Sequence, residues 1–307
     1  MFFLTEILGL DLLLLGETPA FRSFSIKDRN PVSGVYKKNR QLEAPNHAMS
    51  IIHGRLIRYL RSLQIQLPYA TACRPGDSPL KNVENHRNSR FFFLLDLRSA
   101  YRGVDMKMLA EALCREDARL QEHVPEVQEF LEQYCRSQFG GLATGAPASP
   151  DLFNLYCASL LDEPIGSRTK GWTYTRYLDD LTISGDMPIS RKMREDIRDI
   201  VGRAGFDVNH TKAQVLDLRK GQIAINGVGL EFGGRIFVPR SYVTHVTGLL
   251  HAALLGDESV RFQVEGAMGV FKQITGRKNQ NRTEQRVLTL YKKFRRGTQY
   301  KRKKAMP

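Results

Sequence analysis

Three aspartates in two separate stretches of the chain have the type and setting for metal chemistry. Asp96 ends the apolar run "RFFFLLDL" at residues 90–97, which is typical of a strand buried on both faces. Asp179 and Asp180 stand side by side in "RYLDDLTISGD", between apolar residues, as at the tip of a hairpin. If these elements are neighbouring strands, the three acids meet at one edge of a sheet. They would then offer hard oxygen ligands, which suit Mg²⁺ that keeps waters and binds phosphates.

The acidic pair alone has a simpler explanation, because aspartates are common in surface turns. Adjacent carboxylates nevertheless repel each other unless they are paired or bound to a metal. Asp96 strengthens the metal interpretation, since it brings a third acid to the pair. Two Mg²⁺ ions about 3.5–4 Å apart are the general device for in-line phosphoryl transfer. The three acids are therefore a candidate site for that chemistry.

The elements that must position these acids mix strands and helices without a βαβ rhythm. We therefore predict an α+β fold with a mostly antiparallel sheet. In chain order we expect a hairpin at 21–45, helices at 46–67, 105–117 and 124–137, a Gly-rich loop and a helix at 151–164, a hairpin at the acidic pair, a helix at 190–204 and a hairpin at 222–239. The chain after residue 240 is expected to be helical and increasingly basic.

The N-terminal stretch "MFFLTEILGLDLLLLGETP" is apolar but is not typical of a targeting segment. It has no basic start, and Glu6 and Asp11 interrupt it. It is also too short and too broken to span a bilayer. We expect an amphipathic packing helix that ends near Gly16 and Pro19.

The net charge of +14 is concentrated near the C-terminus. From Lys272 onward there are 13 Lys and Arg and one acid, Glu284, so this segment carries +12 of the total. Such a local charge suits a polyanion, and nucleic acid is the first candidate. For the last stretch, "YKRKKAMP", a disordered basic tail is the alternative. The four cysteines form no CxxC motif and no Cys/His cluster at zinc spacing, so we expect reduced thiols in a cytosolic protein.

Four motifs around these acids resemble the palm motifs of reverse transcriptases in order and spacing: "FLLDLRSAY", "GLATGAPASPDLFNL", "YLDDL" and "GFDVNHTK". The segment "NRQLEAP" extends the resemblance into the fingers, so that it covers roughly residues 20–240. It is closest to bacterial enzymes of the retron type, because "NVENH" at 82–86 is similar to their Asn-and-His signature, with Val83 where that signature favours Ala. The chain departs from the retron pattern where those enzymes usually carry Val-Thr-Gly, since it has Asn226-Gly227-Val228-Gly229.

The resemblance implies a right-hand polymerase fold with fingers, palm and thumb. The N-terminal helix and fingers would span 1–90 and the palm 91–235, with part of the fingers inserted around 105–140. A helical basic thumb would span 236–307. The implied activity is that of an RNA-directed DNA polymerase, which adds dNTPs to a primer on an RNA template. Two Mg²⁺ ions would be its cofactor, with Mn²⁺ as a substitute.

The resemblance also implies roles for single residues. Asp96 and Asp179 would bind or bridge both metal ions with help from the backbone carbonyl of Leu97. Asp180 would complete the pair or hold its geometry. Lys212 matches the lysine that assists the leaving pyrophosphate, with a plain surface lysine as the equal alternative.

Further residues are expected to bind the nucleotide. Arg40 would hold the triphosphate, because a guanidinium fork matches phosphate oxygens. Lys37 and Lys38 are weaker candidates, since a solvated strand face explains them equally well. In this family an aromatic at the position of Tyr101 excludes a 2′-hydroxyl, and plain core packing is the alternative. The loop under the nucleotide would consist of Gly141, Thr144, Gly145 and Pro147.

Nucleic acid would be bound by Asn82 and His86 and by the thumb residues Lys292, Lys293, Arg295 and Arg296. The aromatics Tyr291, Phe294 and Tyr300 lie between these charges and would stack on bases or pack, with packing favoured for Phe294. The implied partners are a structured noncoding RNA template, the RNA–DNA duplex, dNTPs and an effector protein, without a membrane. The setting would be antiphage defence in a bacterial cytoplasm.

Other functions stay open at this point. A non-retron defence reverse transcriptase is the main alternative, and a catalytically silent RNA-binding relative belongs to another class. A group II intron protein fits less well, because the chain ends soon after the thumb. A diversity-generating enzyme also fits less well, since the loop continues with "ASP" where that group carries Ser-Gln.

Overall fold

The structure is a computed structural model that describes residues 2–29, 36–276 and 281–304. The predicted turn "RNPVSG" and the side chains of Lys37, Lys38 and Tyr300 lie outside the part that it describes in full. The chain divides into two compact units, one formed by residues 1–28 and 38–217 and the other mostly by residues 218–307. These two units do not correspond to the three predicted parts, so the division into fingers, palm and thumb stays a prediction.

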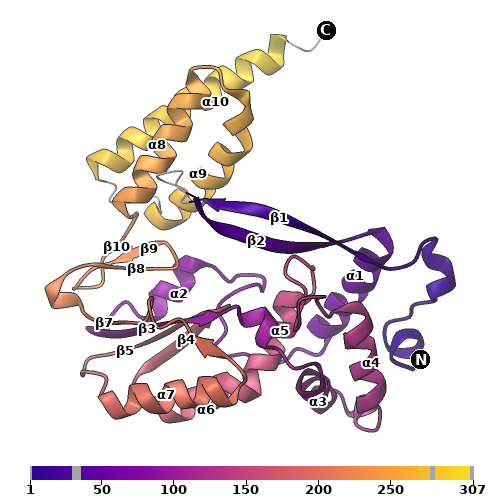
Figure 1. Cartoon of the computed structure of the whole chain (residues 1–307). Helices are drawn as coiled ribbons and strands as arrows, with labels where there is room; N and C mark the ends of the chain where they lie inside the picture. The colour runs from indigo at the N-terminus through magenta and orange to yellow at the C-terminus, as the bar shows by residue number, and fades with distance from the viewer. Residues whose placement is uncertain (1, 30–35, 277–280, 305–307) are drawn as a thin grey trace. The chain divides into compact units, whose positions relative to one another are not determined.

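A central antiparallel sheet organises the first unit (Figure 1). Its strand order is β4-β5-β3-β6, and β7 pairs with β3 as well. All of these pairings are antiparallel, so the predicted sheet and the predicted hairpin at the acidic pair are confirmed. The strands are β3 (Phe91–Arg98), β4 (Thr173–Tyr177), β5 (Asp180–Gly185), β6 (Asp207–Val208) and β7 (Gln214–Asp217).

The two faces of this sheet are covered by different helices. Side chains alternate along a strand, so Tyr174 and Arg176 of β4 point to one face and Thr175 to the other. The first face meets α5 (Ser149–Cys157), the π-helical turn η5 (Ala158–Asp162), α6 (Glu163–Arg168) and α7 (Arg191–Arg203), of which α6 and α7 run along the sheet in Figure 1. The second face meets α2 (Pro79–Asn85).

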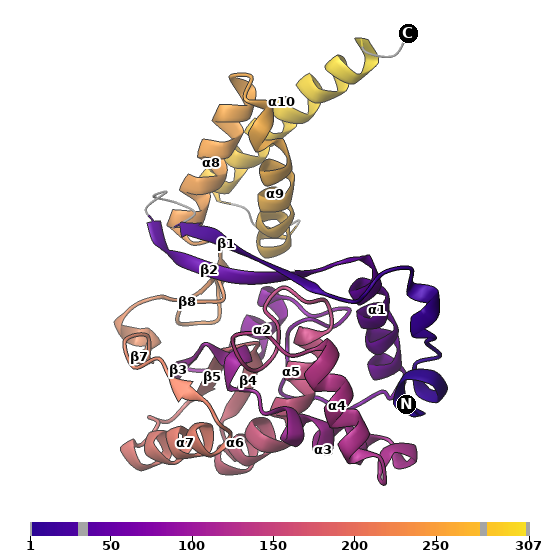
Figure 2. The same ribbon diagram turned by 45° about the vertical axis from the view of Figure 1, so that its right-hand side comes forward.

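Three more helices pack together in the first unit (Figure 2). They are α1 (His47–Ser62), α3 (Met106–Glu116) and α4 (Val124–Tyr134), which confirm the predicted helices to within a few residues. The Asn46 side chain caps α1 by accepting a hydrogen bond from the Met49 N–H group. The helix ends earlier than predicted because Gln64 takes a left-handed conformation, with φ 51°. The predicted helix at 151–164 begins at Ser149 and continues through η5 into α6.

The N-terminal prediction is wrong in its secondary structure. The stretch forms two short turns, the π-helical η1 (Phe3–Ile7) and the 3-10 helix η2 (Leu12–Leu15), instead of one amphipathic helix. Gly9 at φ 60° interrupts the helix between them, and the Asp11 side chain starts the second turn by accepting from the Leu13 N–H group. Packing is as predicted, since Phe3 is fully buried against the ring of Phe130.

The remaining strands form two small sheets. The first pairs β1 (Phe21–Arg29) with β2 (Tyr36–Pro45), which confirms the strands of the predicted hairpin at 21–45. The second lies in the second unit and has the order β10-β9-β8. It contains β8 (Ile223–Ile225), β9 (Val228–Leu230) and β10 (Ile236–Phe237), so the predicted hairpin at 222–239 gains a third strand.

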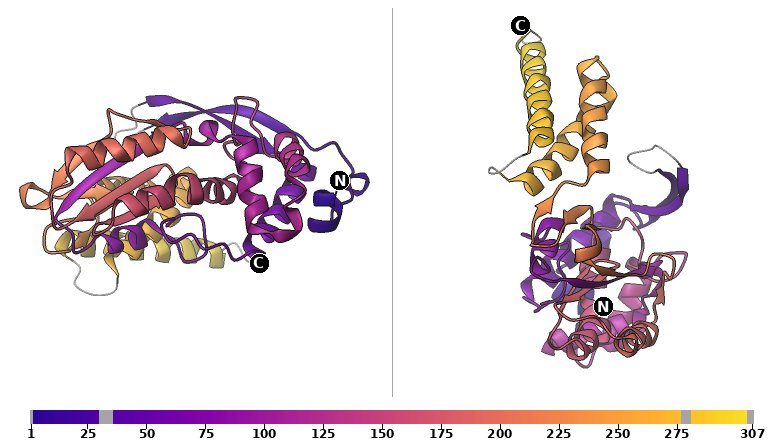
Figure 3. Two further views of the ribbon diagram at one scale, coloured as in Figure 1. Left: turned by 90° about the horizontal axis from the view of Figure 1, so that it is seen from below. Right: turned by 90° about the vertical axis from the view of Figure 1, so that its left-hand side faces the viewer.

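Among its described residues the second unit also has three α-helices, which confirm the helical prediction after residue 240 (Figure 3). They are α8 (Arg240–Leu254), α9 (Arg261–Thr275) and α10 (Arg282–Lys304). Their contact faces are apolar, with Leu250, Met268 and Phe271 fully buried. Within the described ranges, no helix of either unit is both long and apolar enough to cross a membrane.

Two buried histidines link elements that are distant in the sequence. In α1, His53 Nδ1 accepts from the Ala148 N–H group at 3.2 Å, and its Nε2–H group donates to the Tyr134 carbonyl at 2.9 Å. Both ring nitrogens are thus satisfied in the neutral form. Burial lowers the pKa of His53 to about 4 and that of His86 to about 3.

Acidification below pH 6.5 is expected to reduce the free energy of unfolding. Both histidines then take up a proton in the unfolded chain but stay neutral in the folded one, at about 1.4 kcal/mol per pH unit each. The loss continues down to about pH 4 for His53 and about pH 3 for His86, and neither contributes above pH 6.5. Urea unfolding at several pH values checks this, with His53→Gln expected to show a shallower dependence. Equal slopes for wild type and variant would contradict it.

Candidate active site

The turn between β4 and β5 brings the three predicted acids to one end of the central sheet. Asp96 of β3 and Asp180 of β5 are direct cross-strand partners in the register. The Leu97 N–H group donates to the Asp179 carbonyl at 2.8 Å, which ties the turn to β3. Two stretches more than eighty residues apart in the sequence therefore meet at the predicted position.

The Asp96 side chain is held by donors from the segment between β6 and β7. Lys212 Nζ lies 2.5 Å from Asp96 Oδ1, and Asn209 Nδ2 donates to Asp96 Oδ2 at 3.0 Å. The Asn209 N–H group also donates to the Asp96 carbonyl at 2.8 Å. Both carboxylate oxygens of Asp96 thus have partners, and the hydrogen bond to Asp96 raises the pKa of Lys212.

The charge around Asp179 is unbalanced. Partial desolvation raises the pKa of Asp179 above its usual range, and repulsion from the Asp96 carboxylate adds to this effect. The positive charges of Lys212 and Arg40 act in the opposite direction. The cluster therefore favours the approach of further positive charge.

The donor set fits Mg²⁺ in its chemistry, because it consists of hard carboxylate oxygens. The exposed Lys212 side chain already brings one positive charge to these acids. In the described part of the chain, no three His, Cys, Asp or Glu side chains are placed so that they could hold a metal ion together. The predicted ligands thus lie close together, but their side chains do not all point to a common metal position. The Asp96 carboxylate instead points to Lys212 and Asn209.

Tyr101 lies in the 3-10 turn η3 (Ala100–Gly103) that follows β3. Its half-buried ring packs edge-on against Phe153, with 5.2 Å between the ring centroids. Its carbonyl accepts from the Leu142 N–H group at 2.8 Å. Gly141 has φ 61°, and a Cβ atom there would lie 2.0 Å from the Tyr101 carbonyl oxygen. The Gly-rich loop therefore packs directly on the backbone of the predicted sugar-contacting residue.

The same loop is joined to β2. The Glu43 N–H group donates to the Thr144 carbonyl at 2.8 Å. Gly145 has φ 106°, and a Cβ atom there would lie 3.2 Å from the Glu43 carbonyl oxygen. Arg40 is exposed on β2, three residues before Glu43, and its charge reaches Asp179. The predicted nucleotide-binding residues and the acids thus share one region of the first unit.

Asn82 and His86 do not lie where the prediction placed them. Both are fully buried between α2 and the sheet. His86 Nε2 lies 2.7 Å from Thr175 Oγ1 and Nδ1 lies 2.7 Å from Ser184 Oγ, while the Thr175 hydroxyl donates to Asn82 Oδ1 at 2.6 Å. Side chains without exposed surface cannot contact nucleic acid, so that prediction is wrong. Asn82 and His86 instead connect α2 to β4 and β5, the two strands of the hairpin that carries Asp179 and Asp180.

The predicted thumb cations lie on α10 in the second unit. Lys292, Lys293, Arg295 and Arg296 are exposed, whereas Tyr291 and Phe294 are buried, which confirms the packing alternative for these two aromatics. Lys272 of α9 lies 4.1 Å above the Tyr291 ring. A hollow of about 320 Å³ is lined by Lys272, Leu288, Tyr291, Lys292, Arg295 and Arg296.

Sequence reasoning missed Asn209. Its side chain and its backbone both hold Asp96, and its Oδ1 accepts from the Thr211 hydroxyl at 2.8 Å. An Asn three residues before a candidate lysine is a signal for an Asx-type turn, which could have indicated a positioning role.

Comparison with protein families gives one match over most of the chain. The model described as "Reverse transcriptase (RNA-dependent DNA polymerase)" matches residues 29–244. The retron Ec83 reverse transcriptase of Escherichia coli is 27% identical over 219 residues, which are 68% of this chain and 63% of that protein. The retron Ec86 reverse transcriptase of Escherichia coli is 24% identical over 251 residues, which are 80% of this chain and 74% of that protein. The match thus spans less than two thirds of the Ec83 enzyme.

Among solved structures, telomerase from Candida albicans, in complex with a fragment of telomeric RNA, has a similar fold. The TM-score is 0.50 at 10% sequence identity, over 82% of this chain and 53% of that chain. At this identity the similarity concerns the fold.

Substitution of Gly141 tests the contact between loop and η3. Gly141→Ala is expected to lower the free energy of unfolding by about 2 kcal/mol or more, because a positive φ combines with a collision against the Tyr101 carbonyl. Gly140→Ala is the matched control, since Gly140 has φ 92° but no atom within 4 Å of a Cβ. It is expected to cost only about 1 kcal/mol for backbone strain. Urea unfolding measures both, and equal losses would refute the contact.

Proposed function

The chain belongs to the reverse transcriptase (RNA-dependent DNA polymerase) family and has the right-hand polymerase fold, and we propose that it extends a primer with dNTPs on an RNA template. The observation that carries this proposal is the meeting of Asp96, Asp179 and Asp180 at one end of the central sheet, beside the Lys212 ammonium. Three acids and a cation in this arrangement suit phosphoryl transfer.

Asp96 and Asp179 would hold the metal ions together with the Leu97 carbonyl, and Asp180 would complete the set. Two Mg²⁺ ions, or Mn²⁺ in their place, supply when bound the positive charge that activates the primer 3′-hydroxyl and stabilises the leaving pyrophosphate. Lys212 is held beside the acids in its protonated form. It can therefore give a proton to the pyrophosphate or neutralise part of its charge.

The nucleotide would be bound by Arg40 and by the backbone of the Gly-rich loop. The exposed guanidinium of Arg40 can grip phosphate oxygens with two parallel hydrogen bonds. Tyr101, fixed by Phe153 and by the loop, would lie against the sugar and exclude a 2′-hydroxyl. Thr144 and Gly145 would let the backbone approach the nucleotide.

The exposed cations of α10 would contact the phosphates of the RNA–DNA duplex, which gives affinity with little sequence information. A structured noncoding RNA as template is supported by the likeness to the two retron enzymes. The proposal also includes an effector protein, a role in antiphage defence and a bacterial cytoplasm, which the resemblance of the sequence to retron-type enzymes implies.

Asp179→Asn is expected to reduce primer extension by at least about 10³-fold, because it removes one of the charges that would hold the metal ions. RNA affinity should stay within about threefold of wild type. Asp186→Asn is the matched control, since Asp186 is exposed just beyond the other end of β5. Extension of a labelled primer with Mg²⁺ and all four dNTPs measures the effect. Wild-type extension by Asp179→Asn would refute the metal assignment, and RNA binding without extension by wild type would favour the silent RNA-binding relative.

Tyr101→Ala is expected to reduce discrimination against ribonucleotides by at least about tenfold, because the side chain that would exclude the 2′-hydroxyl is removed. Tyr101→Phe keeps the ring and its packing on Phe153, so it should retain wild-type discrimination. The ratio of kcat/KM for dGTP and GTP in single-nucleotide incorporation gives the measurement. An unchanged ratio in Tyr101→Ala would mean that Tyr101 only packs in the core.

A further inference from the structure

A fully buried ion pair lies next to the turn between β4 and β5 (Leu178 and Asp179), which is called the acidic turn below. Arg176 of β4 has no exposed surface, and the side chain of its partner Asp162 in η5 is 3% exposed. Arginine is almost never fully buried unless it is paired. Arg176 stands three residues before Asp179, on the face of the sheet opposite to His86. The activity proposed above assigns it no role.

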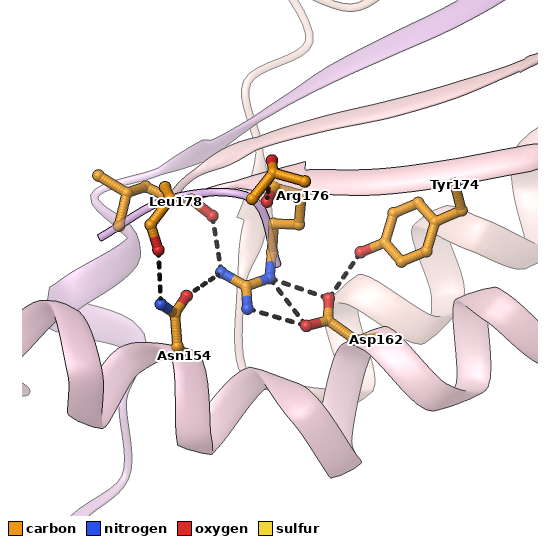
Figure 4. A network of polar contacts seen from close by, with 7 residues as sticks. Asn154, Asp162, Tyr174, Arg176 and Leu178 are labelled. Atoms are coloured by element: carbon orange, nitrogen blue, oxygen red, sulfur yellow. Dashed lines mark hydrogen bonds and ion pairs between the residues drawn. The ribbon is translucent and has the colours of Figure 1, made fainter. Parts of the chain in front are cut away.

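The guanidinium of Arg176 uses each of its nitrogens (Figure 4). Nε and Nη2 donate to the Asp162 carboxylate at 2.9 and 2.8 Å, and the Tyr174 hydroxyl donates to the same carboxylate at 2.8 Å. Nη1 donates to Asn154 Oδ1 of α5 at 3.0 Å. Asn154 in turn donates to the Ala72 carbonyl at 3.0 Å. The position of the guanidinium is thus fixed from several sides.

One further contact reaches the turn itself. Arg176 Nη1 donates to the carbonyl of Leu178 at 3.2 Å, as Figure 4 shows. Leu178 has φ 54°, a left-handed conformation that a leucine rarely adopts. The surrounding contacts must therefore stabilise this conformation.

The contact bears on the direction of the Asp179 side chain. The Leu178 carbonyl belongs to the peptide plane before Asp179 and is held by Arg176. The Asp179 carbonyl belongs to the plane after it and is held by the Leu97 N–H group at 2.8 Å. Because a residue has only two soft backbone dihedrals, holding both flanking planes sets the direction of its Cα–Cβ bond.

We propose that Arg176 is a positioning residue, which holds the Leu178 carbonyl so that the Asp179 carboxylate keeps the orientation that polymerisation requires. Asp162, Tyr174 and Asn154 serve this purpose by fixing the guanidinium. Its catalytic consequence rests on the proposed polymerase function, whereas its effect on the turn does not.

A purely structural role for the ion pair is the competing explanation. Replacement of a buried ion pair by apolar side chains of similar size often leaves a protein as stable or more stable, whereas removal of one partner is strongly destabilising. The double variant Arg176→Met with Asp162→Leu can therefore keep the core intact while it removes the donor to the turn. A lysine offers a single nitrogen, so it can pair with Asp162 but cannot also reach the Leu178 carbonyl in the same fixed geometry.

Kinetics of the double variant test the proposal. We expect a loss in kcat of about 100-fold, because small displacements of a catalytic group have effects of this size. Primer–template affinity and the KM for dNTP should stay within about threefold of wild type. The matched control is Arg168→Met with Asp196→Leu, which removes a partly exposed ion pair between α6 and α7. It should keep the wild-type kcat. A folded double variant with wild-type kcat would overturn the proposal.

Arg176→Lys provides a second test that keeps a positive charge beside Asp162. Its kcat is expected to fall about tenfold at unchanged KM and unchanged primer–template affinity. If the double variant does not fold, this variant decides, and a wild-type kcat in Arg176→Lys would overturn the proposal.

Hydrogen exchange separates this proposal from the polymerase assignment. Loss of the Arg176 contact should speed exchange of the Leu97 amide and of the peptide covering Leu178–Leu181 by at least about tenfold. The Arg168/Asp196 control should leave both unchanged. If wild type extends no primer, the polymerase assignment fails and exchange still tests the contact. Equal exchange in wild type and both Arg176 variants would refute it.

Discussion

Repulsion between carboxylates is the constraint on which the rest of this structure depends. Asp96 and Asp180 face each other across two neighbouring strands, and Asp179 is adjacent to them. Like charges directly opposite in a sheet are destabilising, so other contacts must hold the strands in this register. The Lys212 ammonium and the Asn209 side chain act on Asp96, and the Leu97 N–H group holds the turn. The same excess of negative charge is what would attract a divalent cation.

Buried polar networks on the two faces of β4 fix how β4 pairs with β5 and therefore where the turn with Asp179 lies. Thr175 points to His86 and Asn82, whereas Arg176 points to Asp162. A slip by one residue would exchange these faces and would leave an arginine and a carboxylate buried without partners. Because an unpaired buried charge costs far more than an apolar mismatch, these networks specify one pairing of β4 with its neighbours. Because only one pairing is stable, the acids at the end of the hairpin are held in one position.

The region proposed to bind the nucleotide is assembled in a different way, through contacts between backbones. The Gly-rich loop meets the Tyr101 carbonyl on one side and Glu43 on the other, and glycines with positive φ make both approaches possible. Backbone contacts of this kind restrict sequence only at the glycines. The loop is therefore visible in the sequence as a cluster of glycines, while its partner Glu43 carries no comparable signal.

The sequence by itself determined the local features, namely the strands and helices, the antiparallel sheet, and the acids, glycines and terminal cations. These depend on periodicity, turn chemistry and residue type within short windows. The tertiary structure alone decided which polar side chains are buried and which partner each one finds. For this reason Asn82 and His86 were misjudged as binding residues and Asn209 was missed. Arg176 resembles any charged strand residue in the sequence. Only the contacts with Asp162 and Asn154, which belong to other elements, show that its charge is buried and paired. Burial and pairing of this kind depend on residues that are distant along the chain.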